Sequence, residues 1–162
     1  MGMLASYGSV APQIAAATVG TDQRVYITWQ DTRQGTEIFA ARSINAGMTF
    51  EAAKRVSSVA NPAPGVSREQ RMAADAAGHV VVVYTSTRDG PRDIFLGYSI
   101  DGGVFWQPTD IRLDTDTGGT GTSISPVVGL TGTGLAVAAW LDFRSSGTTG
   151  NGDIYVRRIQ PQ

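Results

Sequence analysis

Arginine recurs at one position along this sequence and is the residue with the clearest capacity for binding chemistry. Arg33, Arg88 and Arg144 follow one another at intervals of 55 and 56 residues. Each lies two positions after a short polar residue, namely Asp31, Ser86 and Asp142. A guanidinium group binds a carboxylate through two parallel hydrogen bonds, so these arginines could hold an acidic ligand. They could instead pair locally with the aspartates and fasten a turn, an interpretation we favour because the arginine recurs in every unit.

Another group of charges occurs once in the chain. Arg68, Glu69 and Arg71 lie at the start of the second unit, where the other two units carry Pro12 and Pro126. Residues that break a repeat are better candidates for a specific ligand-binding site than residues that follow it. The alternative is a solvated end of a loop, where exposed charges are common.

A metal or cofactor site is not expected. The sequence has no cysteine and one histidine, His79, so a zinc ligand set is missing. The segment Asp114-Thr115-Asp116 resembles part of a calcium loop but lacks the later glutamate that would complete one. The glycine-rich stretches 118–121 and 147–152 precede no helical pattern, which argues against phosphate-binding loops. We therefore predict no metal and no cofactor.

The bulk composition bounds the classes of partner. The 162 residues carry a formal net charge of −1 with both signs interspersed, which predicts no nucleic-acid-binding face. No apolar run reaches the roughly 20 residues that cross a bilayer, so no membrane partner is predicted. No signal peptide is visible, because the first residues lack a basic segment followed by an apolar one. The compartment therefore stays open.

The elements that position these residues are short β-strands in a threefold repeat. Charged residues make up 17% of the chain and glycine numbers 20, a balance typical of many strands and turns. Each unit opens with a weak strand, near 12–18, 71–75 and 126–130. An apolar strand and a third strand follow, and four strands joined by hairpins make one propeller blade. We predict a single all-β repeat domain over 1–162, with blades at about 11–58, 67–114 and 125–160.

The turn after the third strand is the most specific motif. It reads Ser-Ile-Asn-Ala-Gly-Met-Thr-Phe over residues 43–50 and Ser-Ile-Asp-Gly-Gly-Val-Phe-Trp over residues 99–106. These two segments, 56 residues apart, resemble the Asp-box of the sialidase-like (BNR repeat) β-propeller family, Ser-x-Asp-x-Gly-x-Thr-Trp. The first departs by asparagine for aspartate and phenylalanine for tryptophan, and the second by Phe105 for threonine. The resemblance implies three four-stranded blades, half of a six-bladed sialidase-like propeller.

The physical chemistry of the box favours a structural role. A short polar side chain accepts backbone N–H groups within its own turn, glycine supplies a positive φ, and the aromatic ring packs in the gap between neighbouring sheets. In the family that the motif resembles, the box lies on the face opposite the active site. The residues assigned this role are Ser43, Asn45, Gly47, Phe50, Ser99, Asp101, Gly103 and Trp106.

The third unit ends early, and this bears on partners. After Ile159 the chain has three residues, so the third box and its outer strand are missing. Residues 3–9 are a candidate outer strand that closes blade 3. Because three blades leave open faces that invite pairing, we predict a homodimer that forms a pseudo-six-bladed ring. The alternative is a fragment of a longer secreted propeller protein.

For function, the sequence favours a non-catalytic module for binding or assembly. The resemblance implies carbohydrate as a ligand class and a secreted or cell-surface bacterial setting, although fold does not fix function. The alternative is a glycoside hydrolase of exo-sialidase type, which by the resemblance needs a tyrosine nucleophile beside a carboxylate. The tyrosines are Tyr7, Tyr26, Tyr84, Tyr98 and Tyr155. No sequence pattern pairs one of them with a unique glutamate, so we predict no catalytic residue and lean against an enzyme.

Overall fold

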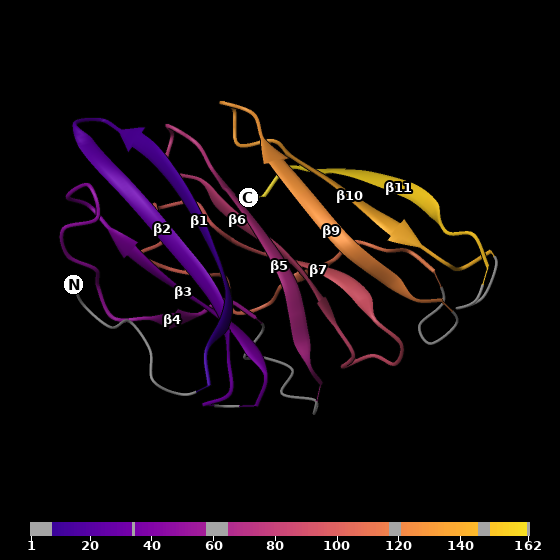
Figure 1. Ribbon diagram of the computed structural model, residues 1–162. Helices are drawn as coiled ribbons and strands as arrows, with labels where there is room; N and C mark the ends of the chain where they lie inside the picture. Colours follow the sequence, from indigo (N-terminus) through magenta and orange to yellow (C-terminus); the bar gives the residue numbers. More distant parts are fainter. Residues whose placement is uncertain (1–7, 34, 58–64, 117–120, 146–149, 162) are drawn as a thin grey trace.

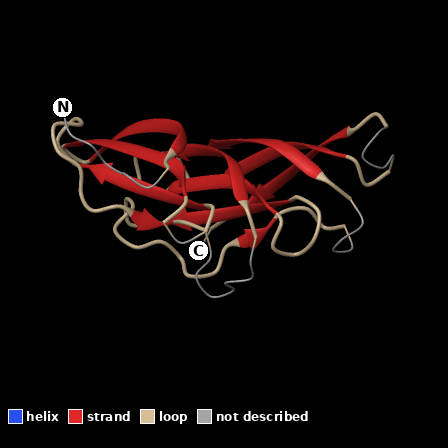
Figure 2. Ribbon diagram, turned by 60° about the horizontal axis from the view of Figure 1, so that its bottom comes forward, coloured by secondary structure: helices blue, strands red, loops and turns tan. Residues whose placement is uncertain are grey.

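The computed structural model describes residues 8–33, 35–57, 65–116, 121–145 and 150–161, and the regular structure in these ranges is β-strand (Figures 1 and 2). Blade 1 contains β1 (Val10–Val19), β2 (Asp22–Asp31), β3 (Glu37–Ser43) and β4 (Lys54–Arg55). Blade 2 contains β5 (Ser67–Ala74), β6 (Val80–Ser86), β7 (Asp93–Ser99) and β8 (Ile111–Arg112). Blade 3 contains β9 (Ser123–Leu130), β10 (Ala136–Asp142) and β11 (Asp153–Ile159).

Each blade is one antiparallel sheet whose strands pair in chain order. Figure 1 shows the three sheets side by side in chain order, from indigo through magenta to yellow. Among the described residues two sheets have four strands and the third has three. The prediction of an all-β chain built from propeller blades is confirmed.

The core lies in the two gaps between neighbouring sheets. Tyr26, Ile38 and Ala40 of blade 1 pack against blade 2 through Val82 and Tyr84. The opposite face of blade 2 packs against blade 3, and the buried residues there include Val81, Val83, Ile94, Leu96, Ala138 and Trp140. Strand β6 is buried along its whole length because sheets cover both of its faces. This explains its run of four valines in place of an alternating pattern.

The innermost strands begin earlier than predicted from the sequence. Strands β1, β5 and β9 start before the expected segments 12–18, 71–75 and 126–130, because a bulge interrupts each ladder and pairing resumes beyond it. The bulge holds one residue with positive φ in each blade: Ala11 at 54°, Glu69 at 56° and Ser125 at 54°. The sequence signal was hidden because none of the three is glycine.

The open end of blade 3 agrees with the early end of the third unit. Strand β11 is the last described strand of its sheet. Most of the expected closing strand, residues 3–7, lies outside the described residues, so that strand remains a prediction. The side chain of Ser9 contacts blade 1, where its hydroxyl donates to Asp31 Oδ2 at 3.1 Å. The described residues include no helix long and apolar enough to cross a membrane.

Candidate functional site

The three repeated arginines lie at the turns between the second and third strands of each blade, and in blades 1 and 3 they pair locally. Arg33 Nη2 lies 2.6 Å from Asp31 Oδ2, and Arg144 Nη2 lies 2.6 Å from Asp142 Oδ2. The backbone N–H of each arginine also donates to the same aspartate at 2.9 Å. These contacts match the local pairing that we favoured over ligand binding.

Each arginine also stacks on a ring of the third strand. The guanidinium carbon lies 4.5 Å from the Phe39 ring centroid for Arg33 and 4.1 Å from that of Tyr155 for Arg144. A guanidinium held between a carboxylate and a ring gains both charge pairing and cation–π attraction. The arginines therefore fix the turns, and their donors face residues of their own blade.

Blade 2 reaches the same arrangement with different residues. It has Ser86 in place of the aspartate, and Asp110, from the turn before β8, supplies the carboxylate instead. Arg88 Nη2 lies 2.5 Å from Asp110 Oδ1, and its guanidinium carbon lies 3.6 Å from the Phe95 ring centroid. Tyr84, which replaces the tryptophan of the other blades, donates its hydroxyl to Asp110 Oδ2. Sequence reasoning missed Asp110 because it is 22 residues from Arg88 in the chain.

These pairings shift the pKa values of the groups involved. The hydrogen bond from Arg33 lowers the pKa of Asp31 far below its usual range. Burial would raise the pKa of Asp142, but hydrogen bonds from Arg144 and Trp140 outweigh it and lower that pKa strongly. Burial and the charge of Asp110 raise the pKa of Tyr84 well above 10. Tyr84 is therefore a neutral, buried hydrogen-bond donor to Asp110.

The once-occurring charges at the start of β5 lie on the bulge of the innermost strand. Glu69 Oε1 accepts from Arg92 Nη1 at 2.9 Å, and its Oε2 accepts from the backbone N–H of Ser125 in blade 3 at 2.8 Å. The adjacent Gln70, 1% exposed, donates to the backbone oxygen of Ala11 in blade 1. Glu69 and Gln70 therefore tie the three bulges together.

Arg68 and Arg71 remain as exposed cations beside this bulge. Arg71 donates to the backbone oxygen of Gln70 at 2.9 Å. Within the described residues neither arginine forms an ion pair. The structure thus separates the sequence candidates into one residue that joins blades, Glu69, and two that present free charge at the surface.

The Asp-box turns form the hydrogen bonds expected of structural turns. Asn45 Oδ1 accepts from the backbone N–H of Thr49, and Asp101 Oδ1 accepts from that of Phe105, both at 2.9 Å. The hydroxyls of Ser43 and Ser99 accept from the backbone N–H groups of Gly47 and Gly103, which have φ of 82° and 80°. These backbone donors all belong to the turn itself.

The aromatic residues of the two boxes pack in different places. Trp106, 8% exposed, packs in the gap between blades 1 and 2. Phe50 packs against Trp29 and Phe39 on the other face of blade 1. No described sheet covers that face, so Phe50 caps it from within its own blade.

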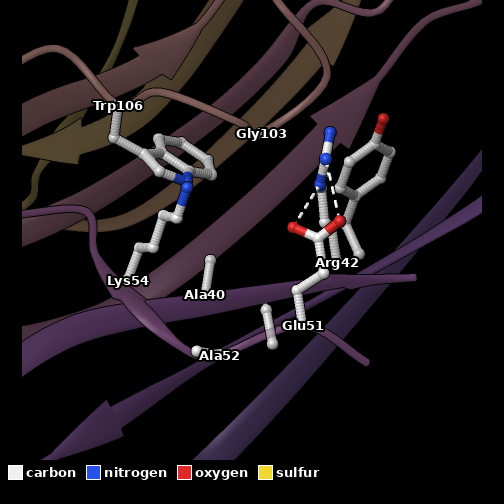
Figure 3. Close-up of a pocket in the computed structure, with 9 residues that line it drawn as sticks. Ala40, Arg42, Glu51, Ala52, Lys54, Gly103 and Trp106 are labelled. Carbon is white, nitrogen blue, oxygen red and sulfur yellow. Dashed lines mark hydrogen bonds and ion pairs between the residues drawn. The ribbon is translucent and has the colours of Figure 1, made fainter. Parts of the chain in front are cut away.

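A small pocket between blades 1 and 2 lies beside these turns (Figure 3). Arg42 and Glu51 form a two-pronged ion pair in it, with Nε–Oε2 and Nη2–Oε1 both 2.8 Å apart, and Trp106 and Lys54 line the other side. Its volume of about 10 Å³ suits one water molecule. The pocket is too small for a sugar ring and is a packing feature of the blade interface.

The acidic residues that open the third strands differ between blades. Glu37 pairs with Arg55 at 2.7 Å, and Asp93 pairs with Arg112 at 2.9 Å, in each case an arginine of the outer strand. Asp153 of blade 3 is exposed. In blades 1 and 2 the outer strand therefore supplies the arginine that pairs with this acidic residue. Burial and the charge of Asp114 raise the pKa of Asp93 to about 7.

Comparison with solved structures finds the fold of this chain in parts of two longer proteins. The chain is similar to a GH93 α-L-arabinofuranosidase of Fusarium graminearum, with a TM-score of 0.58 and 15% identity over 93% of this chain and 46% of that one. It is also similar to an endo-arabinase from Bacteroides thetaiotaomicron, with a TM-score of 0.53 and 14% identity over 96% of this chain and 57% of that one. The chain spans about half the length of these proteins. No protein-family model and no curated protein match the sequence.

Proposed function

We propose that this chain is a non-catalytic half-propeller that pairs head to tail with a second copy and, once paired, binds carbohydrate that carries a carboxylate. The observation that carries the proposal is a pair of open apolar faces at the two ends of the blade array. The faces occupy the same blade positions as faces that are buried between the blades.

The face of blade 3 that points away from blade 2 is apolar and exposed. We call it the forward face; its apolar residues are Val127, Val137, Ala139, Leu141, Ile154 and Val156, and Arg158 lies on it opposite Val137. Ile154 is 71% exposed and Val156 64%, whereas Ile94 and Leu96, at the equivalent positions of blade 2, are 0% exposed. In blade 2 the cover is another blade, which indicates what covers blade 3. Exposed apolar area of this kind typically marks an interface.

The face of blade 1 that points away from blade 2 is its counterpart. This backward face consists of Ile14, Ala16, Val25, Ile27 and Trp29. Ile14 is 69% exposed, Val25 and Ile27 are half-buried, and Trp29 is buried against Phe50. The equivalent face of blade 2, with Val82 and Tyr84, is buried against blade 1. A second copy can therefore present its backward face to this forward face, and a ring results where the rotation closes after two copies.

Arg68 and Arg71 support the ligand class. They lie at the innermost strand, so ring closure would bring these two arginines of each chain to one shared channel. Guanidinium groups recognise carboxylates through two parallel hydrogen bonds. The similar solved structures are named as enzymes of arabinose-containing carbohydrate, which makes a sugar the natural ligand class. The burial of Tyr84 against Asp110 supports a non-catalytic role.

The assembly is tested by light scattering coupled to gel filtration. We expect a mass of twice the 17.0 kDa of one chain. Ile154→Asp places a charge on the forward face and should give a folded monomer. Ile100→Asp is the matched control, because Ile100 is 47% exposed in an Asp-box turn outside both faces. A wild-type chain that is monomeric and melts cooperatively would contradict the proposal.

Ligand binding is tested on an array of acidic and neutral glycans. We expect signal on carboxylated glycans, with roughly ten-fold or greater loss in Arg71→Ala, the size of one lost charge-assisted pair. Arg68→Lys keeps the charge but removes the fork and should weaken binding less than Arg68→Ala. Turnover of a fluorogenic sialoside by the wild-type dimer would show that the protein is an enzyme instead.

A further inference from the structure

Three aspartates converge at the outer edge of blade 2, where the chain leaves for blade 3. Asp93 is the first residue of β7, and Asp114 and Asp116 follow β8. The three carboxylates each offer an oxygen, and these oxygens lie within 4.8 Å of one another. The side chains are 1%, 0% and 5% exposed, respectively. Three carboxylates are thus gathered in a site nearly closed to solvent.

One guanidinium faces all three carboxylates. Arg112 Nη2 lies 2.9 Å from Asp93 Oδ1 and 2.9 Å from Asp116 Oδ1, and its Nε lies 2.8 Å from Asp114 Oδ1. The backbone N–H of Ile94 donates to Asp114 Oδ2 at 3.0 Å. With all three carboxylates ionised, three negative charges against the one positive charge of Arg112 leave an excess of two negative charges.

Two of the buried oxygens have no donor. Asp93 Oδ2 and Asp116 Oδ2 are shielded from solvent and accept no hydrogen bond from any described residue. A buried carboxylate oxygen without a partner is costly, because desolvation is not compensated. The two oxygens therefore indicate that a positively charged group completes the site.

In blade 1 the equivalent carboxylate oxygens are satisfied by hydrogen bonds, without an added cation. There Glu37 takes the place of Asp93, and Arg55 that of Arg112. Glu37 Oε2 accepts from the hydroxyl of Ser57 at 2.6 Å and from that of Ser67 at 3.1 Å. Blade 2 has Asp114 where blade 1 has Ser57, so a donor has been exchanged for another acceptor.

We propose that Asp93, Asp114 and Asp116 bind one hard divalent cation, with Ca²⁺ as the best fit. Oxygens no more than 4.8 Å apart can all lie close to the 2.3–2.6 Å that calcium prefers. A charge of +2 neutralises the cluster together with Arg112. The sequence alone predicts no metal, because a linear calcium loop is incomplete at Asp114 and Asp116; Asp93 completes the set from another strand.

The site would join blade 2 to the entry of blade 3. A Cβ built on Gly121 would lie 2.7 Å from Asp116 Oδ2, so the segment that enters β9 packs directly against this carboxylate. The backbone N–H of Ser123 also donates to the oxygen of Arg92 at 2.7 Å, near the start of β7. A bound cation would hold this junction and stabilise the folded chain.

The experiment uses the full chain, stripped with EDTA and dialysed, and titrated with CaCl₂ or MgCl₂ by calorimetry and thermal melting. We expect one saturable calcium site per chain and a Tm rise of roughly 5 to 10 °C at a hundred-fold excess over Kd. Asp116→Asn should abolish both signals. Asp153→Asn is the control, because it removes the same charge at the equivalent position of blade 3 and should keep both signals.

Two results would overturn the proposal. One is the absence of calcium heat and of a Tm shift at millimolar CaCl₂ in the wild-type chain, which is what a proton or Arg112 alone would give. The other is an unchanged calcium response in Asp116→Asn. Should Asp116→Asn fail to fold, Asp93→Asn provides the same readout, because Asp93 Oδ2 accepts no hydrogen bond from a described residue and an amide nitrogen in its place displaces no donor.

Discussion

Equivalent residues of the middle blade and the end blades differ in their exposure to solvent. Ile94 in blade 2 and Ile154 in blade 3 are each the second residue of the third strand, yet Ile94 is 0% and Ile154 71% exposed. The residue, the strand and the register are equivalent, and the difference is the presence of a neighbouring sheet. Burial in a repeat fold is therefore decided by the next repeat, not by the sequence of the repeat itself.

The largest expected effect comes from truncating this matched pair. Ile94→Ala removes a fully enclosed side chain and should destabilise the chain by about 2 to 5 kcal/mol, the range for buried aliphatic truncation. Ile154→Ala should cost under about 0.5 kcal/mol in the monomer, because its side chain is exposed. Urea denaturation at low protein concentration measures both. Equal costs would show that blade 3 has a cover that the described residues do not contain.

The same pair gives a concentration test of assembly. If two copies close a ring, the cost of Ile154→Ala should grow as the protein concentration rises, since folding and pairing are then coupled. The free energy of unfolding lost in Ile94→Ala should not depend on the protein concentration.

Much of the fold could be predicted from the sequence because its signals are local. The Asp-box turns, the apolar runs ending in Trp29, Tyr84 and Trp140, and the early end of the third unit depend on residues close together in the chain. Turn chemistry and strand alternation act over a few residues, so they can be identified in one sequence without a structure.

The contacts that define the candidate sites could not be predicted in this way. Arg88 pairs with Asp110, Glu69 reaches the backbone of Ser125, and Asp93 meets Asp116. Each pair joins residues more than 20 positions apart, and their approach depends on how the sheets stack. The substitution of Asp31 by Ser86 in blade 2 was visible in the sequence, but nothing local indicated which carboxylate replaces it.

The arginine turns of blades 1 and 3 should stabilise the folded chain less as the solution becomes acidic. The pKa values of Asp31 and Asp142 are lowered in the folded chain, so the unfolded chain binds their protons first. Their stabilisation is present above the unfolded pKa near 4 and is lost as the pH falls below it. Asp142→Asn should be less stable than wild type by roughly 1 to 3 kcal/mol at pH 7, and this gap should narrow towards pH 2.

Thermal melts from pH 7 to pH 2 measure this gap. Asp153→Asn is the control, because Asp153 is exposed and should leave the pH profile unchanged. If the difference in stability between wild type and Asp142→Asn stays constant with pH, Asp142 stabilises the chain through its shape rather than through its charge.

The smallest effect concerns the Asp-box, where blade 1 has Asn45 and blade 2 has Asp101. Burial would raise the pKa of Asp101, but backbone donors led by Phe105 outweigh it and lower the pKa, so the charged form is preferred. Asp101→Asn keeps the accepting Oδ1 and loses the charge, and Asn45 shows that the turn tolerates the amide. We expect the free energy of unfolding, measured by urea denaturation at pH 7, to fall by under about 1 kcal/mol.

The reverse change, Asn45→Asp, removes the amide donor to the Thr49 hydroxyl, at 2.8 Å, and should not stabilise blade 1. A loss above about 2 kcal/mol for Asp101→Asn would show that the charge acts beyond its own turn, where Arg42 lies across the interface between blades 1 and 2.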